Sequence, residues 1–555
     1  MKNKLLLYFA ILLFSACNGK NQLFPDYKIA SPSSERTYYS NQSIVFSTNL
    51  NFSELTWKSN LDGELGNGAQ IVRKLSPGLH IISLENEVSG EIKNVSINIL
   101  KSDSKFDINL ITSFPFVLET ECKKNDFSII SLEGGCEKLS IEKLQTNESY
   151  SDGELSSQKL FRCVTGLNLE NSTKILKPTL NRRVAGEKNL PSEKIFYVIN
   201  THYQAFSNRV YAELFYTSEN VSVYVEKKVL ENEEITERIS SCIKNLESII
   251  IPRLKIFWGS LYDADASGTI TILFSSTLNE EKKAIGFFNP NDLYPFCDDI
   301  SLPSYNPYSN EMDIIYAAIP EDESSLNYSE NSISATLAHE MTHAINFSQR
   351  VIQTQDSVHP LSQMEVFLYE GLSQLSESLC GFGKSGGNSL FVENFLKNSR
   401  DYSFCKNNVY GFSDSVGQRG AVSLFLFWLF EKAGGRKWNT ESHLWEDNGG
   451  ISFLRKLVTS EKSEWDSIGE AFGGETDELF MEFCLELISC GITFDETDPI
   501  TSEPVFETCS LVSYEDSQGY TVIPYSVFKI SLTESFVNMT LSGKNLSHRV
   551  YAVLN

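Results

Sequence analysis

Two histidines, His339 and His343, enclose Glu340 in the pattern H-E-x-x-H. Residues four apart lie on one face of an α-helix, so two imidazoles at this spacing can reach one metal ion from a single helix. Zn²⁺ takes neutral imidazole nitrogens as ligands in a tetrahedral arrangement. Glu340 lies one residue further round the helix, beside the metal, where a general base for a metal-activated water must stand. The pattern therefore demands a helix that turns one face toward a metal site.

The residues around this pattern have helical spacing. Apolar side chains recur along one face at Ile333, Leu337, Met341, Ala344 and Ile345. These positions give the helix a face to bury. No Gly or Pro interrupts residues 330–358, and Ser332 or Ser334 is a suitable helix start. The alternative is a pair of histidines that is only exposed or packed in a core. The chain holds only 7 histidines, so few that the pattern seldom arises by chance.

A catalytic zinc site has three protein ligands and one open position. The H-x-x-G-x-x-H continuation that would supply a third histidine does not follow the pattern. A carboxylate from a second helix is the other source. Residues 364–383 carry an apolar stripe at helical spacing, and Glu370 lies within it. The chain between the two segments is long enough for one helix to end and a second to pack back antiparallel.

Several segments resemble known zinc peptidases. The catalytic pieces are SATLAHEMTHAINFSQ at 334–349 and LYEGLSQLSESLCGFG at 368–383. Weaker matches lie at 286–290, 309–316, 453–457 and 477–480. A glutamate followed by glycine after H-E-x-x-H resembles the gluzincin peptidases, and more narrowly the chain looks like the hyicolysin family of secreted bacterial metallopeptidases over residues 180–495. The resemblance implies that His339, His343 and Glu370 bind Zn²⁺ and that Glu340 is the base.

The sequence also departs from that resemblance. Thermolysin-like gluzincins often place a carboxylate four residues after the glutamate ligand to orient a histidine, and here that position is Gln374. The amide oxygen of Gln374 could still accept from a histidine N–H, and Glu377 is a substitute. Glu377 as ligand in place of Glu370, or as a solvated residue on the helix face, stays open. Tyr410 and His443 are candidate donors to a transition-state oxyanion, against a packing or surface role for each.

A second group of acidic residues lies at 263–268, with the sequence DADASG. It resembles half of an EF-hand calcium loop, but the glutamate that such a loop needs at its twelfth position is Phe274. The EF-hand interpretation therefore fails. A turn that closes on the following strand is one hypothesis, and a Ca²⁺ site of another kind is the other.

Substrate binding by main-chain pairing is a further hypothesis. The residues 312–317 are expected to form a strand beside the cleft at a sheet edge. An extended peptide could add to such an edge as a further strand. An ordinary buried strand is the alternative.

The N-terminus has the pattern of an export signal. Lys2 and Lys4 precede an apolar run at 5–14 that is too short to span a membrane. Small residues then precede Cys17, which resembles a bacterial lipobox in which this cysteine is lipidated. An ordinary cleaved signal with a chance cysteine is the alternative. We expect residues 1–16 to be the signal peptide and the lipid to tether the chain to a membrane of the cell envelope, facing the periplasm or the cell surface.

The rest of the chain suggests several domains. We expect a tether at 17–38, an all-β Ig-like sandwich at 39–102 with Trp57 and His80 inside, and a lead-in of unclear fold at 103–190. Strands followed by helices predict an α+β zincin domain of gluzincin type at 191–497. Short strands return in a small β domain at 498–555.

These observations predict an exported, lipid-anchored zinc endopeptidase that hydrolyses peptide bonds through a metal-activated water, with Glu340 as general base. Its partners would be protein or peptide substrates and the membrane. The formal charge of −25 repels phosphate backbones and argues against nucleic acid. The alternatives are a surface adhesin or binding lipoprotein that keeps a peptidase-like fold with little turnover, and a zinc hydrolase of non-peptide amides.

Overall fold

The computed structural model divides into two compact units, Met1–Leu110 and Ile111–Asn555. It describes residues 27–32, 34, 38–40, 44–48, 55–86, 88–100, 106–118, 127–143, 190–202, 207–355, 357–412, 414–489, 491–494, 496–506, 508–515, 520–532, 539–547 and 549–554. The expected signal peptide, Cys17 and most of the expected tether lie outside these residues. No helix in the described part is long and apolar enough to cross a membrane.

The first unit is rich in β-strands. They are β1 (Ile29–Ser31), β2 (Tyr38–Tyr39), β3 (Ile44–Thr48), β4 (Leu55–Ser59), β5 (Gly63–Asn67), β6 (Gln70–Arg73), β7 (Gly78–Asn86), β8 (Ile92–Leu100) and β9 (Asp107–Leu110). One sheet has the order β1-β3-β6 and another has the order β2-β8-β7-β4-β5. Both sheets contribute to one hydrophobic core, in which Phe46 and Trp57 meet edge to face at 5.5 Å between ring centroids.

His80 lies inside this core, as the sequence predicts. It is fully buried, and its ring nitrogens lie 2.7 Å from the Ser59 hydroxyl and 2.7 Å from the Ser76 carbonyl oxygen. Both nitrogens are thereby satisfied within the unit, which is how a structural histidine is held.

The second unit contains a six-stranded mixed sheet. Its strands are β13 (Glu193–Ile199), β14 (Ser207–Thr217), β15 (Val221–Glu226), β16 (Ile270–Phe274), β17 (Gly286–Phe288) and β18 (Ile314–Ala317). They lie in the order β13-β14-β15-β16-β18-β17. The strands β15, β16 and β18 are parallel, and β17 closes one edge antiparallel to β18. The hypothesis that β18 is the edge strand is wrong, because β17 covers its outer side.

Helical segments connect the strands of this sheet. The helix expected at 235–257 is divided into α2 (Glu233–Asn245), the π-helical turn η2 (Leu246–Ile250) and α3 (Ile251–Phe257). Shorter elements are η1 (Lys227–Val229), α4 (Ser276–Glu281) and η3 (Pro290–Leu293). The fully buried residues of α2 and η2, such as Ile239 and Leu246, recur at the helical spacing that the sequence shows.

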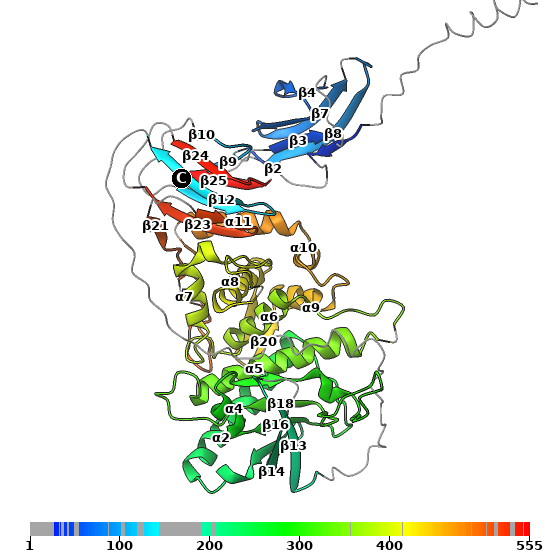
Figure 1. Ribbon diagram of the computed structural model, residues 1–555, viewed down its shortest axis with the longest axis vertical. Helices are drawn as coiled ribbons and strands as arrows, with labels where there is room; N and C mark the ends of the chain where they lie inside the picture. The colour runs from blue at the N-terminus through cyan, green and yellow to red at the C-terminus, as the bar shows by residue number, and fades with distance from the viewer. Residues whose placement is uncertain are drawn as a thin grey trace, which may run out of the picture. The chain divides into compact units, whose positions relative to one another are not determined.

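Helices follow the sheet. They are α5 (Glu330–Phe347), η4 (Ser348–Ile352), α6 (Val366–Leu379), α7 (Ser389–Lys397), η5 (Ser399–Asp401), α8 (Val416–Lys432), α9 (Gly450–Thr459), α10 (Asp466–Phe472) and α11 (Thr476–Ser489). A hairpin of β19 (Arg436–Asn439) and β20 (Leu444–Asp447) interrupts them. Figure 1 shows α5 against the strands on one side and α6 on the other, with α8 beyond α6. The expected order of strands first and helices second is confirmed.

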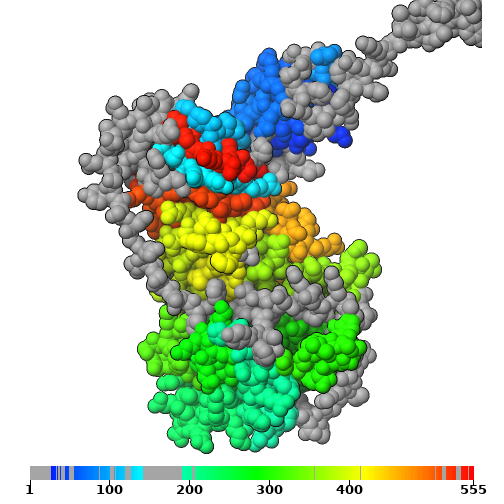
Figure 2. Space-filling model, viewed as in Figure 1, coloured from blue at the N-terminus to red at the C-terminus, as the bar shows by residue number. Residues whose placement is uncertain are grey.

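The C-terminal strands form two further sheets together with strands from the predicted lead-in. The elements are β10 (Phe116–Leu118), β11 (Phe127–Ser131), β12 (Cys136–Lys143), β21 (Ser513–Glu515), β22 (Tyr520–Val522), β23 (Ser526–Ser531), β24 (Met539–Lys544) and β25 (Val550–Leu554). β11 pairs with β23 and β25, and β12 pairs with β22 and β24. Figure 1 shows the cyan early strands among the red late ones, and Figure 2 shows cyan atoms beside red atoms in the same region. The two sheets share one core, so part of 103–190 and the last residues build one β-rich region.

Candidate functional site

The H-E-x-x-H residues lie on α5, as their spacing predicts. The helix begins at Glu330, earlier than the expected Ser332 or Ser334, because the Ser329 hydroxyl caps it by accepting from the Ser332 N–H at 3.2 Å. Almost the whole helix is buried between the sheet and the other helices. His339 is 0% exposed, Glu340 1% and His343 3%, so the motif is not a surface pair.

Glu370 reaches the same place from α6. Glu370 as a whole residue is 2% exposed, and the helix that carries it is buried along most of its length. The next residue, Gly371, lies against α8 so closely that a Cβ there would stand 2.3 Å from Val422 Cγ1. The glycine therefore allows α6 to fit between α5 and α8, which places Glu370 opposite the two histidines.

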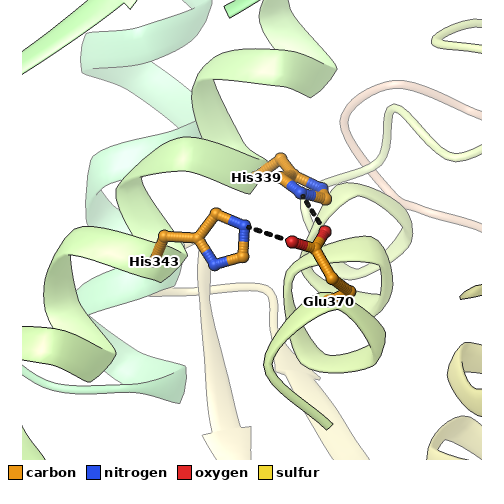
Figure 3. Close-up of side chains that lie close together, drawn as sticks. All are labelled: His339, His343 and Glu370. Carbon is orange, nitrogen blue, oxygen red and sulfur yellow. Dashed lines mark hydrogen bonds and ion pairs between the residues drawn. The ribbon is translucent and has the colours of Figure 1, made fainter. Parts of the chain in front are cut away.

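The three side chains meet at one point, which Figure 3 shows. One nitrogen or oxygen from each of His339, His343 and Glu370 lies within 4.8 Å of the others, a group that could hold a metal ion. His339 Nε2 is 3.3 Å from Glu370 Oε2, and His343 Nε2 is 3.6 Å from Glu370 Oε1. Two imidazole nitrogens and a carboxylate on buried helices are a donor set that suits Zn²⁺.

The far nitrogen of each imidazole has a partner of its own. His339 Nδ1 is 2.9 Å from Glu377 Oε1, and His343 Nδ1 is 2.9 Å from the Ser373 hydroxyl. These contacts turn both Nε2 atoms toward Glu370 and fix the ring orientations. Glu377 thus lies where a histidine-orienting carboxylate is expected. Ser373 was not anticipated, although its position one helical turn beyond Glu370 puts it on the same face.

The contacts of Gln374 differ from those that the sequence predicts. The contact of Tyr369 was not predicted from the sequence. The Gln374 amide nitrogen donates to Asn388 Oδ1 at 2.7 Å, and its buried Oε1 accepts no hydrogen bond from the described residues, so Gln374 does not orient either histidine. Tyr369 stacks on the His343 ring with centroids 4.0 Å apart. This aromatic contact adds a third constraint on His343 beside Ser373 and the helix backbone.

Arg419 of α8 is the other contact that sequence reasoning missed. Its Nη1 lies 2.7 Å from Glu370 Oε2, and both side chains are nearly inaccessible to water. Burial by itself would raise the pKa of Glu370, but the charge of Arg419 and the contacts with His343 and His339 hold that pKa well below its usual range. Burial lowers the pKa of His343 to about 4, which leaves its imidazole neutral as a metal ligand must be.

Glu340 lies beside this group and against β17. Its Oε2 accepts from the Phe288 N–H at 2.9 Å, while its buried Oε1 has no hydrogen-bond partner in the part of the chain that the structure describes. β17 can approach because Gly286 has no side chain, and a Cβ there would stand 2.7 Å from Thr336 Cγ2. Burial raises the pKa of Glu340 to about 8. One oxygen is therefore held and the other is available for chemistry.

Tyr410 and His443, the two candidates for an oxyanion donor, are not brought to this group. Tyr410 is 66% exposed, and its hydroxyl donates to Asp401 Oδ2 at 3.4 Å. His443 is exposed in the turn between β19 and β20 and packs against Trp438 with ring centroids 6.2 Å apart. These contacts correspond to the surface and packing roles that were the alternatives.

The acidic loop forms a second group. Carboxylate oxygens of Asp263, Asp265 and Asp313 lie within 4.8 Å of one another and could hold a metal ion. Asp263 accepts from the Ser267 and Gly268 N–H groups, and Asp313 Oδ1 accepts from the Ala264 N–H at 3.1 Å. These are the contacts of a closed turn. Burial, followed by the charges of Asp265 and Asp263, raises the pKa of Asp313 well above its usual range.

Comparison with known proteins points to one kind of enzyme. No family model matches the sequence. The chain is similar to the neutral metalloprotease ShpI of Staphylococcus hyicus, with 27% identity over 182 residues. That match covers 31% of this chain and 37% of the relative, well under two thirds of its length. The similarity is distant and partial, and it supports relationship to a metallopeptidase.

Proposed function

We propose that this chain is a zinc-dependent endopeptidase in which His339, His343 and Glu370 hold the metal. The observation that carries the proposal is the meeting of both Nε2 atoms with the Glu370 carboxylate in a buried place, each group held by a second contact. Similarity to a neutral metalloprotease supports the same activity and a protein or peptide substrate.

Glu340 acts as general base in this proposal. A zinc ion at this place would supply Lewis-acid chemistry, polarising the scissile carbonyl and making a water molecule more acidic. The Phe288 N–H holds Glu340 Oε2, so the residue has little freedom to turn. Its Oε1 takes the proton from the attacking water and later delivers it to the leaving amine. The surrounding burial keeps other water away from this proton transfer.

The finer assignments are part of the same proposal. The glutamate on a second helix supports a gluzincin-type zincin domain of the hyicolysin kind. Two β-sheets around one core in the first unit support an Ig-like spacer with no chemistry of its own. The sequence before Cys17 supports export and a lipid anchor in the cell envelope, facing the periplasm or the cell surface.

Metal removal and restoration test the proposed activity. The purified chain is incubated with a library of internally quenched peptides before chelation, after chelation, and after Zn²⁺ is returned. We expect cleavage that is lost on chelation and restored by about one equivalent of Zn²⁺. Binding of zinc without cleavage of any peptide would instead favour a binding lipoprotein, and cleavage that survives chelation would contradict a metallopeptidase.

A further inference from the structure

A buried guanidinium connects the proposed zinc ligand Glu370 to Asp414, in the loop that precedes α8. Arg419 Nη1 is 2.7 Å from Glu370 Oε2, while its Nε and Nη2 each lie 2.8 Å from one oxygen of Asp414. The exposed fractions of the three side chains are 1% for Arg419, 3% for Glu370 and 14% for Asp414. Both carboxylates therefore share one cation away from solvent.

A helix cap and close packing at the start of α8 place Arg419 in the buried interior. The Ser415 hydroxyl caps the helix by accepting from the Gln418 N–H at 3.3 Å. Gly417 and Gly420 flank Arg419 and allow close packing. A Cβ at Gly417 would stand 2.1 Å from the Tyr402 ring, and one at Gly420 would stand 2.2 Å from a backbone oxygen of α7. Larger residues at either position would push α8 outward and Arg419 with it.

The charges in this bridge do not balance. One guanidinium faces the carboxylates of Glu370 and Asp414, so the three side chains sum to one negative charge when all are ionised. Without the guanidinium, the buried carboxylate of Glu370 would lose this counter-charge, which is costly.

The bridge also restricts the orientation of the Glu370 carboxylate. Arg419 engages Oε2 of Glu370 by a charge-assisted hydrogen bond, and Oε1 lies 3.6 Å from His343 Nε2. The two ends of the carboxylate are therefore not equivalent. Asp414 grips the guanidinium by a fork of two bonds, so Arg419 cannot swing away from Oε2.

We propose that Arg419, held by Asp414, is a positioning residue of the metal site. It fixes the orientation of the Glu370 carboxylate toward the two histidines, and it offsets part of the negative charge of the buried cluster. This inference rests on the proposed function, because it takes Glu370 as a zinc ligand.

The test measures affinity for Zn²⁺ alone, by competition with a chromogenic chelator, without any peptide substrate. We expect Arg419→Gln to weaken zinc binding by about 10- to 100-fold, the usual cost of losing a contact that orients a metal ligand. Arg253→Gln is the matched control, since Arg253 makes a similar buried two-bond pair with Asp498 at 2.6 and 3.0 Å. The control should lower the melting temperature and leave zinc affinity unchanged.

A milder variant covers the case in which Arg419→Gln does not fold. Arg419→Lys keeps the charge, but a single ammonium group cannot make the fork to Asp414 and the bond to Glu370 together. We expect weaker zinc binding and, with Co²⁺ in place of Zn²⁺, a changed visible absorption, because a less restrained Glu370 would alter the ligand geometry.

Wild-type zinc affinity in Arg419→Lys, or an equal loss in Arg253→Gln, would overturn the positioning role while leaving the proposed peptidase intact. A wild-type chain that binds no zinc would instead overturn the proposed function.

Discussion

Two groups in this molecule each bring three ligand atoms within 4.8 Å of one another, yet they are built very differently. The histidine–glutamate group lies on two long buried helices, and each member has a further contact, from Glu377, Ser373 or Arg419. The aspartate group lies on a loop and at the start of a strand, and its oxygens accept from N–H groups of that same loop. One arrangement orients ligands, and the other closes a turn.

The difference teaches that proximity of ligand atoms is a weak sign of a metal site. A site is precise when its side chains are held by rigid elements and by contacts beyond the ligands. Asp313 shows the opposite condition, since burial and the like charges of Asp265 and Asp263 raise its pKa. The experiments below separate the two groups, beginning with the largest expected effect.

Loss of a proposed ligand should abolish zinc binding. We expect His343→Ala to weaken zinc affinity by more than the roughly 100-fold that loss of an outer contact costs, because a buried ligand disappears. Zinc content after dialysis measures this, with Asp263→Asn as the comparison from the acidic group. If the two variants retained equal zinc, the contrast between the groups would fail.

Loss of a contact behind a histidine should have a smaller effect. Glu377→Ala removes the acceptor of His339 Nδ1, so we expect zinc affinity to fall by about 10- to 100-fold. Glu377→Gln should lose less, because its amide oxygen can still accept that hydrogen bond. Gln374→Ala serves as a control on the same helix, since Gln374 contacts Asn388 and not a histidine. If chelator competition showed the same loss of zinc affinity in Gln374→Ala as in Glu377→Ala, the orienting role of Glu377 would be contradicted.

The Ser373 hydroxyl, which contacts His343 Nδ1, is expected to contribute less to zinc affinity than Glu377 does. Ser373→Ala leaves His343 Nδ1 without this partner, but Tyr369 still stacks on the ring at 4.0 Å. We expect zinc affinity to fall by less than about 10-fold, below the range for an outer contact that acts alone. Zinc titration of Ser373→Ala, Tyr369→Leu and the double variant would show whether both contacts help to hold the His343 ring. Wild-type zinc affinity in the double variant would exclude a role for both contacts.

The smallest effect is predicted for the acidic group. Asp313→Asn removes a buried carboxylate whose charged form is disfavoured, so without divalent metal we expect the melting temperature to rise by roughly 2–4 °C, for a change of about 1 kcal/mol. Zinc affinity should not change. Thermal scans with and without Ca²⁺ check this directly. Stabilisation of the wild type by Ca²⁺ that Asp313→Asn abolishes would show that the aspartates are a built site after all.

The sequence reveals the parts of the site that depend on local spacing. His339, Glu340 and His343 follow from a helical period of a few residues, and Glu370 follows from an apolar stripe on a neighbouring segment. Glu377 was within reach because it lies on the same helix face as Glu370. Arg419 and Ser373 were not, since a lone arginine or serine in a helix carries no sign of the residue it will meet.

The fold shows the same limit. The strands, the long helices and their order are evident from periodicity, whereas pairing across the chain is not. β12 meets β24 some 400 residues later, as Glu142 opposite Thr540 illustrates. Likewise β17 is only Gly286–Phe288, too short to show a period of two, and it takes the sheet edge that the sequence suggested for β18.

The central claim is that Glu340 performs proton transfer beside a metal held by His339, His343 and Glu370. The most direct measurement compares peptide cleavage by wild type and Glu340→Gln after both have been shown to contain equal zinc. The account predicts that Glu340→Gln keeps its zinc and loses cleavage by about 10²- to 10⁴-fold. Cleavage by Glu340→Gln at the wild-type rate, with zinc bound in both, would contradict it.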